Sequence, residues 1–456
     1  MRKFLFLLIA CFMVLILGLF FIPQSDLNEI RYGGRLVALK DVLKLYVGVS
    51  NSKYLNSISV LERKIINGKN VVIFDRFYEN DVPRHSRAKL TAFLAKKDEN
   101  ELYVFIANGE SFSIKKPLIT SFASNVKYDV KRIKNNLKDI VTTKDFFLSN
   151  PSDRHGVKDV TIFDGYVYVA HTDKKSEENC TFAQILRSPL PTSDGLEFTK
   201  VFKTECLDLS KGQGGRAVAH MVGARIIPTT KKIFFSVGML NNFLLPQNDQ
   251  FSFGKILEID YEHEVNIPDL ASLDDTYHIA KGVRNPQGLA KCDDHLFFSS
   301  HGPKGGDEVN YIPLKSDSLP INFGWPIASY GTHYDGTFGD SAPSYAPMYQ
   351  DHTKYGFQES LIHYTPSVAP SQLIALPKNN SKCDEGILLY MATMGYRDDH
   401  AQKSIHRYEV SVENGVVNVI QPSIFSIGGR IRDIENDDNV IWFWDESRGS
   451  LGYLEK

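Results

Sequence analysis

Two arginines near the C-terminus have the spacing of a carboxylate-binding pair. Arg430 and Arg432 stand at positions i and i+2 of the segment Gly429-Arg430-Ile431-Arg432-Asp433, and in a strand such residues point to the same face. Two planar guanidiniums side by side are natural partners of carboxylates, because each can donate two parallel hydrogen bonds. The spacing therefore predicts a clamp for an anionic ligand, with a solvated strand edge as the alternative.

A histidine is the second candidate for chemistry. His220 begins the segment His220-Met221-Val222-Gly223-Ala224-Arg225, which leads to an apolar run ending at Gly238. A neutral imidazole can take a proton from a hydroxyl group near neutral pH. A histidine buried inside a sheet would look the same in sequence, so the role of His220 depends on its surroundings.

Three linked motifs between residues 282 and 326 carry a family resemblance. They read Gly282-Val283-Arg284-Asn285-Pro286-Gln287-Gly288, then His301-Gly302-Pro303-Lys304-Gly305-Gly306-Asp307-Glu308, then Phe323-Gly324-Trp325-Pro326. In this order and spacing they resemble the pyrroloquinoline-quinone-dependent soluble glucose and aldose sugar dehydrogenases, the sorbosone-type family. The resemblance begins loosely near Lys89 and is firm from about Gly156 onward.

The resemblance implies a quinone cofactor and a calcium ion at the mouth of a β-propeller. It makes His220 the base that takes the proton of a sugar's anomeric hydroxyl, and Arg284 the group that stabilises developing negative charge. The other residues expected at the quinone are Asn285, Arg430 and Arg432, with Arg154 as a further carboxylate partner and Lys403 as the nearest candidate for the family's lysine. The backbone carbonyls of Gly302 and Pro303 would hold the calcium, and Glu308, with carbonyls near Phe323 and Ser329, would form a second calcium site.

The implied function is oxidation of an aldose or a related sugar, with electrons passing to an external acceptor because the chain has no Cys-x-x-Cys-His haem motif. Three positions depart from the family pattern: Arg154 stands where relatives have a glutamine that contacts the quinone, and Ala219 and Met239 stand where relatives have aspartates, one of which orients the catalytic histidine. A catalytically impaired propeller that binds a ligand or partner is therefore an alternative. A hydrolase or lactonase on a six-bladed propeller is a weaker third option.

A recurring strand pattern predicts the fold independently of the resemblance. Six short runs of aromatic and β-branched residues follow polar turns, and their starts lie 53 to 91 residues apart. The runs begin at Leu102, Val167, Ile233, Leu296, Ile387 and Val440. Such repetition is typical of propellers, so we expect an all-β, six-bladed β-propeller over residues 85–456. Polar residues 128–142 are expected to form a short helix or linker.

The N-terminal segment differs from the rest of the chain. Met1-Arg2-Lys3 precedes an unbroken apolar run from Phe4 to Ile22, which is long enough to span a bilayer as a helix. We expect residues 1–24 to be a membrane anchor or uncleaved signal, with lipidation at Cys11 as a less favoured alternative, and residues 25–84 to be an extension of uncertain structure. The basic start favours a single-pass, inner-membrane protein that faces the periplasm.

Composition narrows the remaining possibilities. A net charge of −2, from 52 basic and 54 acidic residues, does not suit a nucleic-acid-binding domain, which is usually strongly basic. Apart from Cys11 the chain has four cysteines, and no spacing typical of zinc ligands. Cys180 and Cys206 are expected to face each other across paired strands, which would permit a disulfide. The case for Cys292 and Cys383 is weaker.

Overall fold

The computed structural model describes residues 55–77, 91–116, 127–141, 155–175, 177–191, 195–212, 217–261, 273–338, 342–380, 382–395, 402–413 and 416–456, and the backbone of 30–32 and 35–37. The chain divides into two compact units. The smaller comprises residues 1–54 and 78–87, and in it β1 (Ile30–Tyr32) pairs antiparallel with β2 (Arg35–Val37). The larger comprises residues 55–77 and 88–456.

The larger unit is built from six groups of antiparallel strands, and the first and last groups join into one nine-stranded sheet where Ser57 pairs with Asp129. The first three are β5 (Ala92–Lys96), β6 (Glu101–Ile106), β7 (Ser111–Lys115) and β8 (Lys127–Ile133); β9 (Gly156–Phe163), β10 (Tyr166–Lys175), β11 (Cys180–Pro189) and β12 (Thr199–Lys203), with β13 (Leu207–Asp208); and β14 (Gly223–Pro228), β15 (Lys232–Val237), β16 (Lys255–Asp260) and β17 (Thr276–Lys281), with β21 (Ile321–Asn322) parallel to β17.

The other three groups follow along the chain, and the last one is completed by two strands from an earlier segment. They are β18 (Pro286–Cys292), β19 (His295–Ser300), β20 (Asp307–Pro313) and β22 (Ile362–Tyr364); β23 (Pro370–Pro377), β24 (Ile387–Thr393), β25 (Ser404–Glu413) and β26 (Val416–Ser426); and β27 (Ile431–Asp437), β28 (Val440–Asp445), β29 (Ser450–Glu455) and β4 (Lys69–Arg76), with β3 (Ser57–Ile66). Helical residues in the described part form α4 (Leu137–Ile140) and the 3-10 turns η2 (Leu209–Lys211), η3 (Ala219–Met221), η4 (Leu273–Asp275), η5 (Thr353–Tyr355), η6 (Lys378–Asn380) and η7 (Cys383–Glu385).

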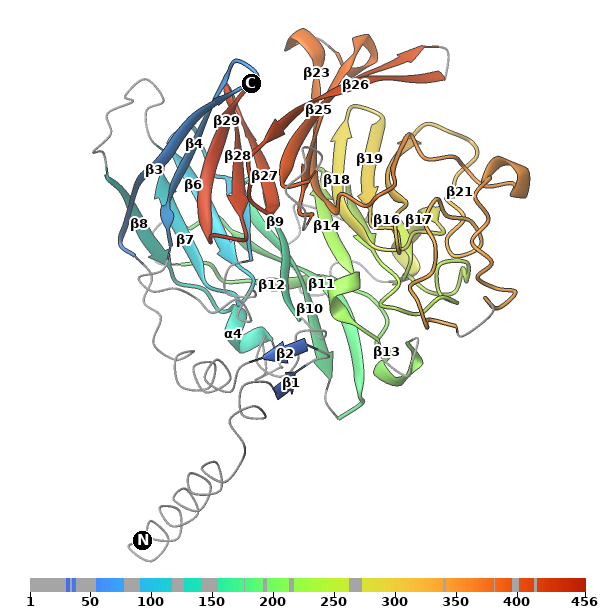
Figure 1. Cartoon of the computed structure of the whole chain (residues 1–456). Coiled ribbons are helices and arrows are strands. Elements are labelled where there is room, and N and C mark those ends of the chain that lie inside the picture. Colours follow the sequence, from blue (N-terminus) through green and yellow to red (C-terminus); the bar gives the residue numbers. More distant parts are fainter. Residues whose placement is uncertain are drawn as a thin grey trace, which may run out of the picture. The chain divides into compact units, whose positions relative to one another are not determined.

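The first strands of the six groups form a closed ring. Each of β5, β9, β14, β18, β23 and β27 contacts the next, and β27 contacts β5. The last group is completed by a strand from far upstream, since β4 pairs with β29 through Val71↔Leu454 and Val72↔Tyr453 (Figure 1). Residues 55–77, which the sequence analysis placed in an uncertain extension, therefore belong to the last group of strands in the larger unit. The arrangement is an all-β, propeller-like fold.

The second strand of each group carries the recurring pattern seen in the sequence. The six apolar runs lie in β6, β10, β15, β19, β24 and β28. These strands are buried, and β28, with the sequence Val-Ile-Trp-Phe-Trp-Asp, is buried along its whole length. Apolar side chains from neighbouring groups pack against each other, as Phe235 and Phe202 do, and so form cores between adjacent sheets.

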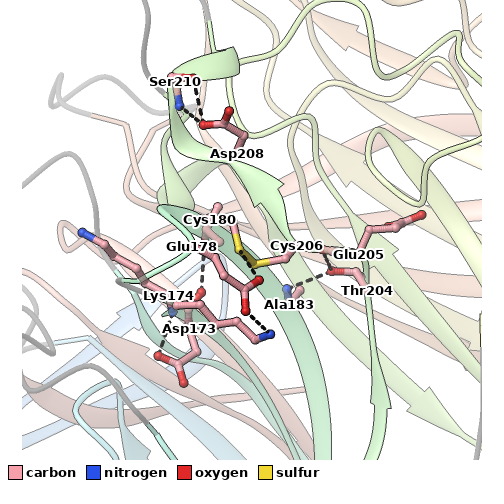
Figure 2. The surroundings of a disulfide bond; sticks show 12 residues. Asp173, Lys174, Glu178, Cys180, Ala183, Thr204, Glu205, Cys206, Asp208 and Ser210 are labelled. Atoms are coloured by element: carbon pink, nitrogen blue, oxygen red, sulfur yellow. Dashed lines mark hydrogen bonds and ion pairs between the residues drawn. A yellow bond between two sulfur atoms is a disulfide. The ribbon is translucent and has the colours of Figure 1, made fainter.

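Two disulfides fasten the ends of strands. Cys180 at the start of β11 is bonded to Cys206, just before β13, and their Cα atoms are 5.4 Å apart (Figure 2). Cys292 at the end of β18 is bonded to Cys383 in η7, with Cα atoms 5.8 Å apart. The first links strands within one group and the second links two neighbouring groups, so both pairings considered from the sequence are present.

The localisation expected from the sequence is contradicted. Among the residues that the structure describes, no helix has both the length and the apolar character needed to cross a bilayer. A single-pass, inner-membrane protein facing the periplasm is therefore not supported, nor is the membrane as a partner. Residues 1–24, to which the anchor was assigned, lie outside the described residues.

Candidate active site

A cavity of about 1530 Å³ opens where the first strands of the groups begin. Its walls come from segments that are far apart in the sequence, because the ring brings the starts of β5, β9, β14, β18 and β27 to the same end of the fold. The residues predicted from the sequence that line it are His220, Arg284, Asn285, Gly302, Pro303, Arg430 and Arg432. The structure therefore brings together seven of the ten predicted site residues.

His220 lies on the short turn η3 and is exposed to the cavity. Its neighbours Ala219 and Met221 are buried, at 1% and 6% exposure. The backbone N–H of Val218 donates to the carbonyl of Leu240 at 3.0 Å, which fixes the start of the turn. Burial of the flanking residues thus holds η3 in place while the imidazole projects into the cavity.

Met239 occupies the position at which the resembling family has an aspartate. Its side chain is fully buried, and its sulfur accepts a hydrogen bond from the indole Nε1 of Trp325 at 3.0 Å. Its backbone N–H donates to the carbonyl of Arg284 at 2.9 Å. Met239 therefore supports Trp325 and Arg284, and it supplies no carboxylate to orient His220.

Arg284 is held by contacts on two sides. Its Nη1 donates to the carbonyl of His301 at 3.0 Å, and the guanidinium lies 5.3 Å from the centre of the Trp325 ring, an attractive cation–π arrangement. Burial lowers the pKa of Arg284, and the nearby Tyr334 and Asp307 partly oppose this. Its Nε has no hydrogen-bond partner among the described residues, so a ligand oxygen could accept from it.

Two further polar residues of the cavity were present in the motifs but were not assigned a role. Asp307 accepts from the backbone N–H of Gly302 at 2.9 Å and of Ala369 at 2.7 Å, and so ties the 302–306 turn to the start of β23. The Nε2 of His301 lies 2.7 Å from the carbonyl of Pro370 and must donate to it. Burial lowers the pKa of His301, so its ring is neutral at pH 7.

The turn after His301 is too compact to accept side chains at its glycines. A Cβ atom on Gly302 would lie 2.2 Å from the carbonyl oxygens of Gly305 and Gly306, and both of those glycines have positive φ, at 85° and 66°. Glycine is therefore required at these positions, and backbone groups of the turn line the cavity beside the side chains of Pro303 and Lys304. This is a local arrangement in which carbonyl oxygens can serve as ligands for a hard cation.

Glu308 does not line the large cavity. It lies beside a small internal pocket of about 10 Å³, which Phe323 and Ser329 also line. Its carboxylate accepts from the amide of Asn310 at 3.1 Å, and burial raises the pKa of Glu308 to about 7. The residues expected at a second calcium site thus do lie together, around a space separate from the large cavity.

Arg430 and Arg432 share a carboxylate that the sequence did not reveal. Arg430 Nη2 lies 3.5 Å from one oxygen of Glu446, and Arg432 Nε donates to the other. The three side chains are 13%, 14% and 1% exposed. We call this group the clamp: it holds two guanidiniums and one carboxylate, and so keeps an excess of one positive charge facing the cavity.

A second buried ion cluster lies directly against the clamp. Arg225 Nη1 donates to Asp159 at 2.8 Å and to Asp433 at 2.7 Å, and its Nη2 donates to the carbonyl of Arg432 at 3.2 Å. Asp433 also accepts from the N–H of Leu94 at 2.7 Å. We call Asp159, Arg225 and Asp433 the triad. Burial raises the pKa of Asp433 to about 7, against the opposing effect of Arg225.

The remaining two predicted residues have other positions. Lys403 does not line the cavity; its carbonyl accepts from the N–H groups of Ile427 and Gly428 at 3.1 and 3.0 Å. Arg154 lies outside the described residues. Two lysines that the sequence did not indicate, Lys158 of β9 and Lys304, line the cavity, and Lys304 lies 3.2 Å from a carboxylate oxygen of Asp335.

Known proteins resemble this chain in sequence and in fold. The Glucose / Sorbosone dehydrogenase family matches residues 148–452, about two thirds of the chain. Aldose sugar dehydrogenase YliI of Escherichia coli (strain K12) is 30% identical over 149 residues, which are 32% of this chain and 38% of that protein. The alignment thus spans well under half of this curated relative.

Two solved structures share the fold. The soluble aldose sugar dehydrogenase from Escherichia coli, in its apo form, has a TM-score of 0.58 at 18% identity, over 85% of this chain and 99% of that one. The calcium structure of a Trichoderma reesei carbohydrate-active enzyme of family AA12 has a TM-score of 0.51 at 11% identity, over 89% and 99%. The family resemblance inferred from the motifs is therefore confirmed, and these structures confirm a fold of the same kind.

Proposed function

Because this chain belongs to the glucose/sorbosone dehydrogenase family, we propose that it is a dehydrogenase that oxidises an aldose or a related sugar at the anomeric carbon, on a six-bladed β-propeller. The observation that carries this proposal is the convergence of His220, Arg284, Arg430 and Arg432 on one cavity. Preorganised cations beside a candidate base suit an oxidation in which a hydroxyl oxygen loses a proton and the carbon that bears it loses a hydride.

The cofactor that fits this cavity is pyrroloquinoline quinone, a flat molecule with three carboxylates. Arg284, Arg430, Arg432 and Lys158 line the cavity together with one carboxylate, Asp307, and Glu446 lies between the two clamp arginines. The excess of positive charge suits a polyanion. The clamp would hold carboxylates, with Asn285 beside it, and the Nε of Arg284 would donate to an oxygen of the ring. Lys158 replaces Lys403 as the lysine expected to bind the quinone, and Arg154 stays a candidate partner for one of its carboxylates.

When bound, the quinone would accept the two electrons of the oxidation, and an external acceptor would then remove them. His220 would take the proton of the anomeric hydroxyl while the same carbon loses a hydride, so the sugar becomes a lactone. Arg284 would stabilise negative charge in the cavity with little reorganisation, since Trp325 and the carbonyl of His301 already fix its guanidinium. Its role does not depend on the missing aspartate at Met239.

Calcium would occupy two positions. The carbonyls of Gly302 and Pro303 lie in a glycine-rich turn on the cavity wall and could hold a calcium ion beside the quinone. Glu308, with backbone groups at Phe323 and Ser329, could hold a second ion at the internal pocket. Removal of calcium with a chelator would test both sites. Loss of the ion beside the quinone should weaken quinone binding, and loss of the ion at the internal pocket should lower the free energy of unfolding.

The proposal is tested by reconstitution. Quinone and calcium are added to the purified chain, quinone binding is followed by absorbance, and dye reduction is measured with a panel of aldoses. We expect binding and sugar-dependent turnover, and a loss of about 10² to 10⁴-fold in kcat for His220→Ala, the range of a general base. His278→Ala, on the outer strand β17, serves as the control. Binding without turnover in the wild type would overturn the proposal.

A further inference from the structure

The outer strand of the fifth group, β26, has an edge that no described strand covers. It stands last in the order β23-β24-β25-β26, so only β25 pairs with it. It is also the longest of the described strands, with 11 residues. Because β24 pairs with β25 only as far as Val410, the hairpin end of β25 and β26 continues past the other strands of the group (Figure 1).

The outer strands of the other groups are protected against pairing with a further strand. The charged residues on these strands are Glu62, Arg63 and Lys64 in β3, Lys127, Asp129, Lys131 and Arg132 in β8, and Lys200 and Lys203 in β12. The other outer strands are short, since β13 and β21 have two residues and β22 has three. Charge and short length are the usual protections of a sheet edge. The sequence of β26, Val-Val-Asn-Val-Ile-Gln-Pro-Ser-Ile-Phe-Ser, has neither.

The second half of β26 is partly covered by the turn between β3 and β4. The Nδ2 of Asn67 donates to the carbonyl of Ile424 at 2.8 Å, and the Nζ of Lys64 donates to the carbonyl of Ile427 at 2.7 Å. Pro422 has no backbone N–H to offer. The part of the edge that remains available to another strand is therefore residues 416–420, which we call the open edge.

The open edge exposes apolar side chains as well as backbone groups. Val416 and Ile420 are 59% and 61% exposed, and Asn418 between them is exposed too. The alternate residues Val417 and Val419 pack against an apolar core cluster, which fixes the face that each side chain occupies. Exposed β-branched residues beside unpaired backbone groups are the features through which one sheet adds a strand from another chain.

A second copy of this chain fits the open edge because the edge is complementary to itself. In an antiparallel pair with a two-fold axis at Asn418, this residue lies opposite Asn418 of the second copy, and Val416 lies opposite Ile420. No residue of β26 is charged, so the axis brings no like charges together. The same arrangement on β3, centred on Arg63, would place two guanidiniums opposite each other.

From these observations we propose that the chain forms a two-fold dimer in which the open edges of two copies pair antiparallel around Asn418. The two four-stranded sheets then become one continuous sheet. One pair of short edges is small compared with a permanent interface, so the dimer exchanges reversibly with the monomer. No residue of β26 lines the cavity around His220, so the dimer does not depend on the proposed function.

The test measures the association of the full chain by sedimentation, over concentrations from about 1 to 100 µM. We expect an equilibrium between monomer and dimer. Asn418→Lys should weaken the dimer more than about tenfold, because two ammonium groups then face each other across the axis, and Asn418→Asp should do the same with two carboxylates. An equal mixture of the two variants should recover the dimer, since opposite charges then meet.

The matched control is Ile65→Lys on β3, which also places a lysine at an exposed apolar position, 73% exposed, and should leave the affinity unchanged. Circular dichroism checks that each variant is folded. A monomer at every concentration would overturn the dimer, and the open edge would then await a strand of a different protein. Assemblies larger than a dimer would overturn the two-fold axis. A dimer that persists in Asn418→Lys, or a mixture that stays monomeric, would exclude Asn418 from the axis.

Discussion

The triad and the clamp are two neighbouring ion clusters with opposite balances of charge. The triad places one guanidinium between two carboxylates, and the clamp places one carboxylate between two guanidiniums. Side chains of the triad are at most 3% exposed, whereas those of the two clamp arginines are 13% and 14% exposed. The carbonyl of Arg432, which accepts from Arg225, connects them.

The difference shows which cluster serves the fold and which is open to a ligand. The triad uses its donors and acceptors within the protein: Arg225 also donates to the carbonyl of Gln287 at 2.8 Å, and Asp159 accepts from the N–H of Ile226 at 2.8 Å. It thereby joins β5, β9, β14, β18 and β27, five strands of the ring. The two arginines of the clamp line the cavity, where a carboxylate could accept hydrogen bonds from them.

Replacing the triad arginine should have the largest effect. Arg225→Met leaves two buried carboxylates without a counter-ion, so we expect the free energy of unfolding to fall by about 3 to 5 kcal/mol. Urea unfolding at pH 7.5 measures this loss. Adding Asp159→Asn and Asp433→Asn to the same chain should recover most of the stability. A loss below about 1 kcal/mol for Arg225→Met alone would mean that the triad does not hold the ring together.

Charge reversal in the clamp should affect binding and leave the fold intact. Arg430→Glu places a second carboxylate beside Glu446, so we expect quinone affinity to fall by more than about 100-fold, as for a buried charge-assisted contact. Absorbance titration measures the affinity, and circular dichroism checks the fold. Arg132→Glu changes the net charge equally on an exposed arginine paired with Glu110 and should bind the quinone as the wild type does. Unchanged affinity in Arg430→Glu would exclude the clamp as the quinone site.

The pH dependence of the free energy of unfolding should report on Asp433 of the triad. Burial raises the pKa of Asp433 to about 7 from an ordinary value of 3.8, so between pH 4 and 7 the unfolded chain releases a proton that the folded chain retains. Stability contributed by this group therefore falls as pH rises through that window and is constant above it. Urea unfolding at pH 5, 6, 7 and 8 should show a smaller fall for Asp433→Asn. Parallel curves for the two proteins would contradict the raised pKa.

The smallest effect is expected for the carboxylate of the clamp. Glu446→Gln removes the internal competitor for Arg430 and Arg432, so we expect quinone affinity to rise about 3- to 10-fold while stability falls by about 1 kcal/mol. The same absorbance titration and urea unfolding measure both. A weaker affinity would show instead that Glu446 orients the two arginines for the ligand.

Local patterns predicted the repeated strands better than the strands that close the ring. The runs at Leu102 and Val440 are apolar and β-rich, and they lie in β6 and β28. The segment at 128–142, expected to be a short helix or linker, instead contains β8 as well as α4, because Tyr128 and Val130 alternate with charged residues and give only two buried positions. The partnership of β4 with β29 could not be inferred, since no local signal connects segments so distant.

The motifs located the cavity, but they did not reveal the ion pairs around it. Arg284 and Gly302 were found because they stand in a contiguous, family-like segment. Arg225 and Asp433 are 208 positions apart, and only the ring brings them together. Glu446 stands outside any recognised motif, so the sequence did not predict that a carboxylate lies between the two clamp arginines. The hydrogen bond from Trp325 to Met239 could not be predicted either, because the two residues are 86 positions apart.

The pairing of β4 with β29, which completes the last group of strands, has a consequence for synthesis on the ribosome. About 380 residues separate these strands, and ribosomes add about 5 to 20 residues per second. The edge of β4 that will receive β29 therefore waits roughly 20 to 75 seconds without its partner. Unpaired strand edges are sites of aggregation, so the nascent chain depends on whatever shields β4 until Ser450–Glu455 has left the exit tunnel.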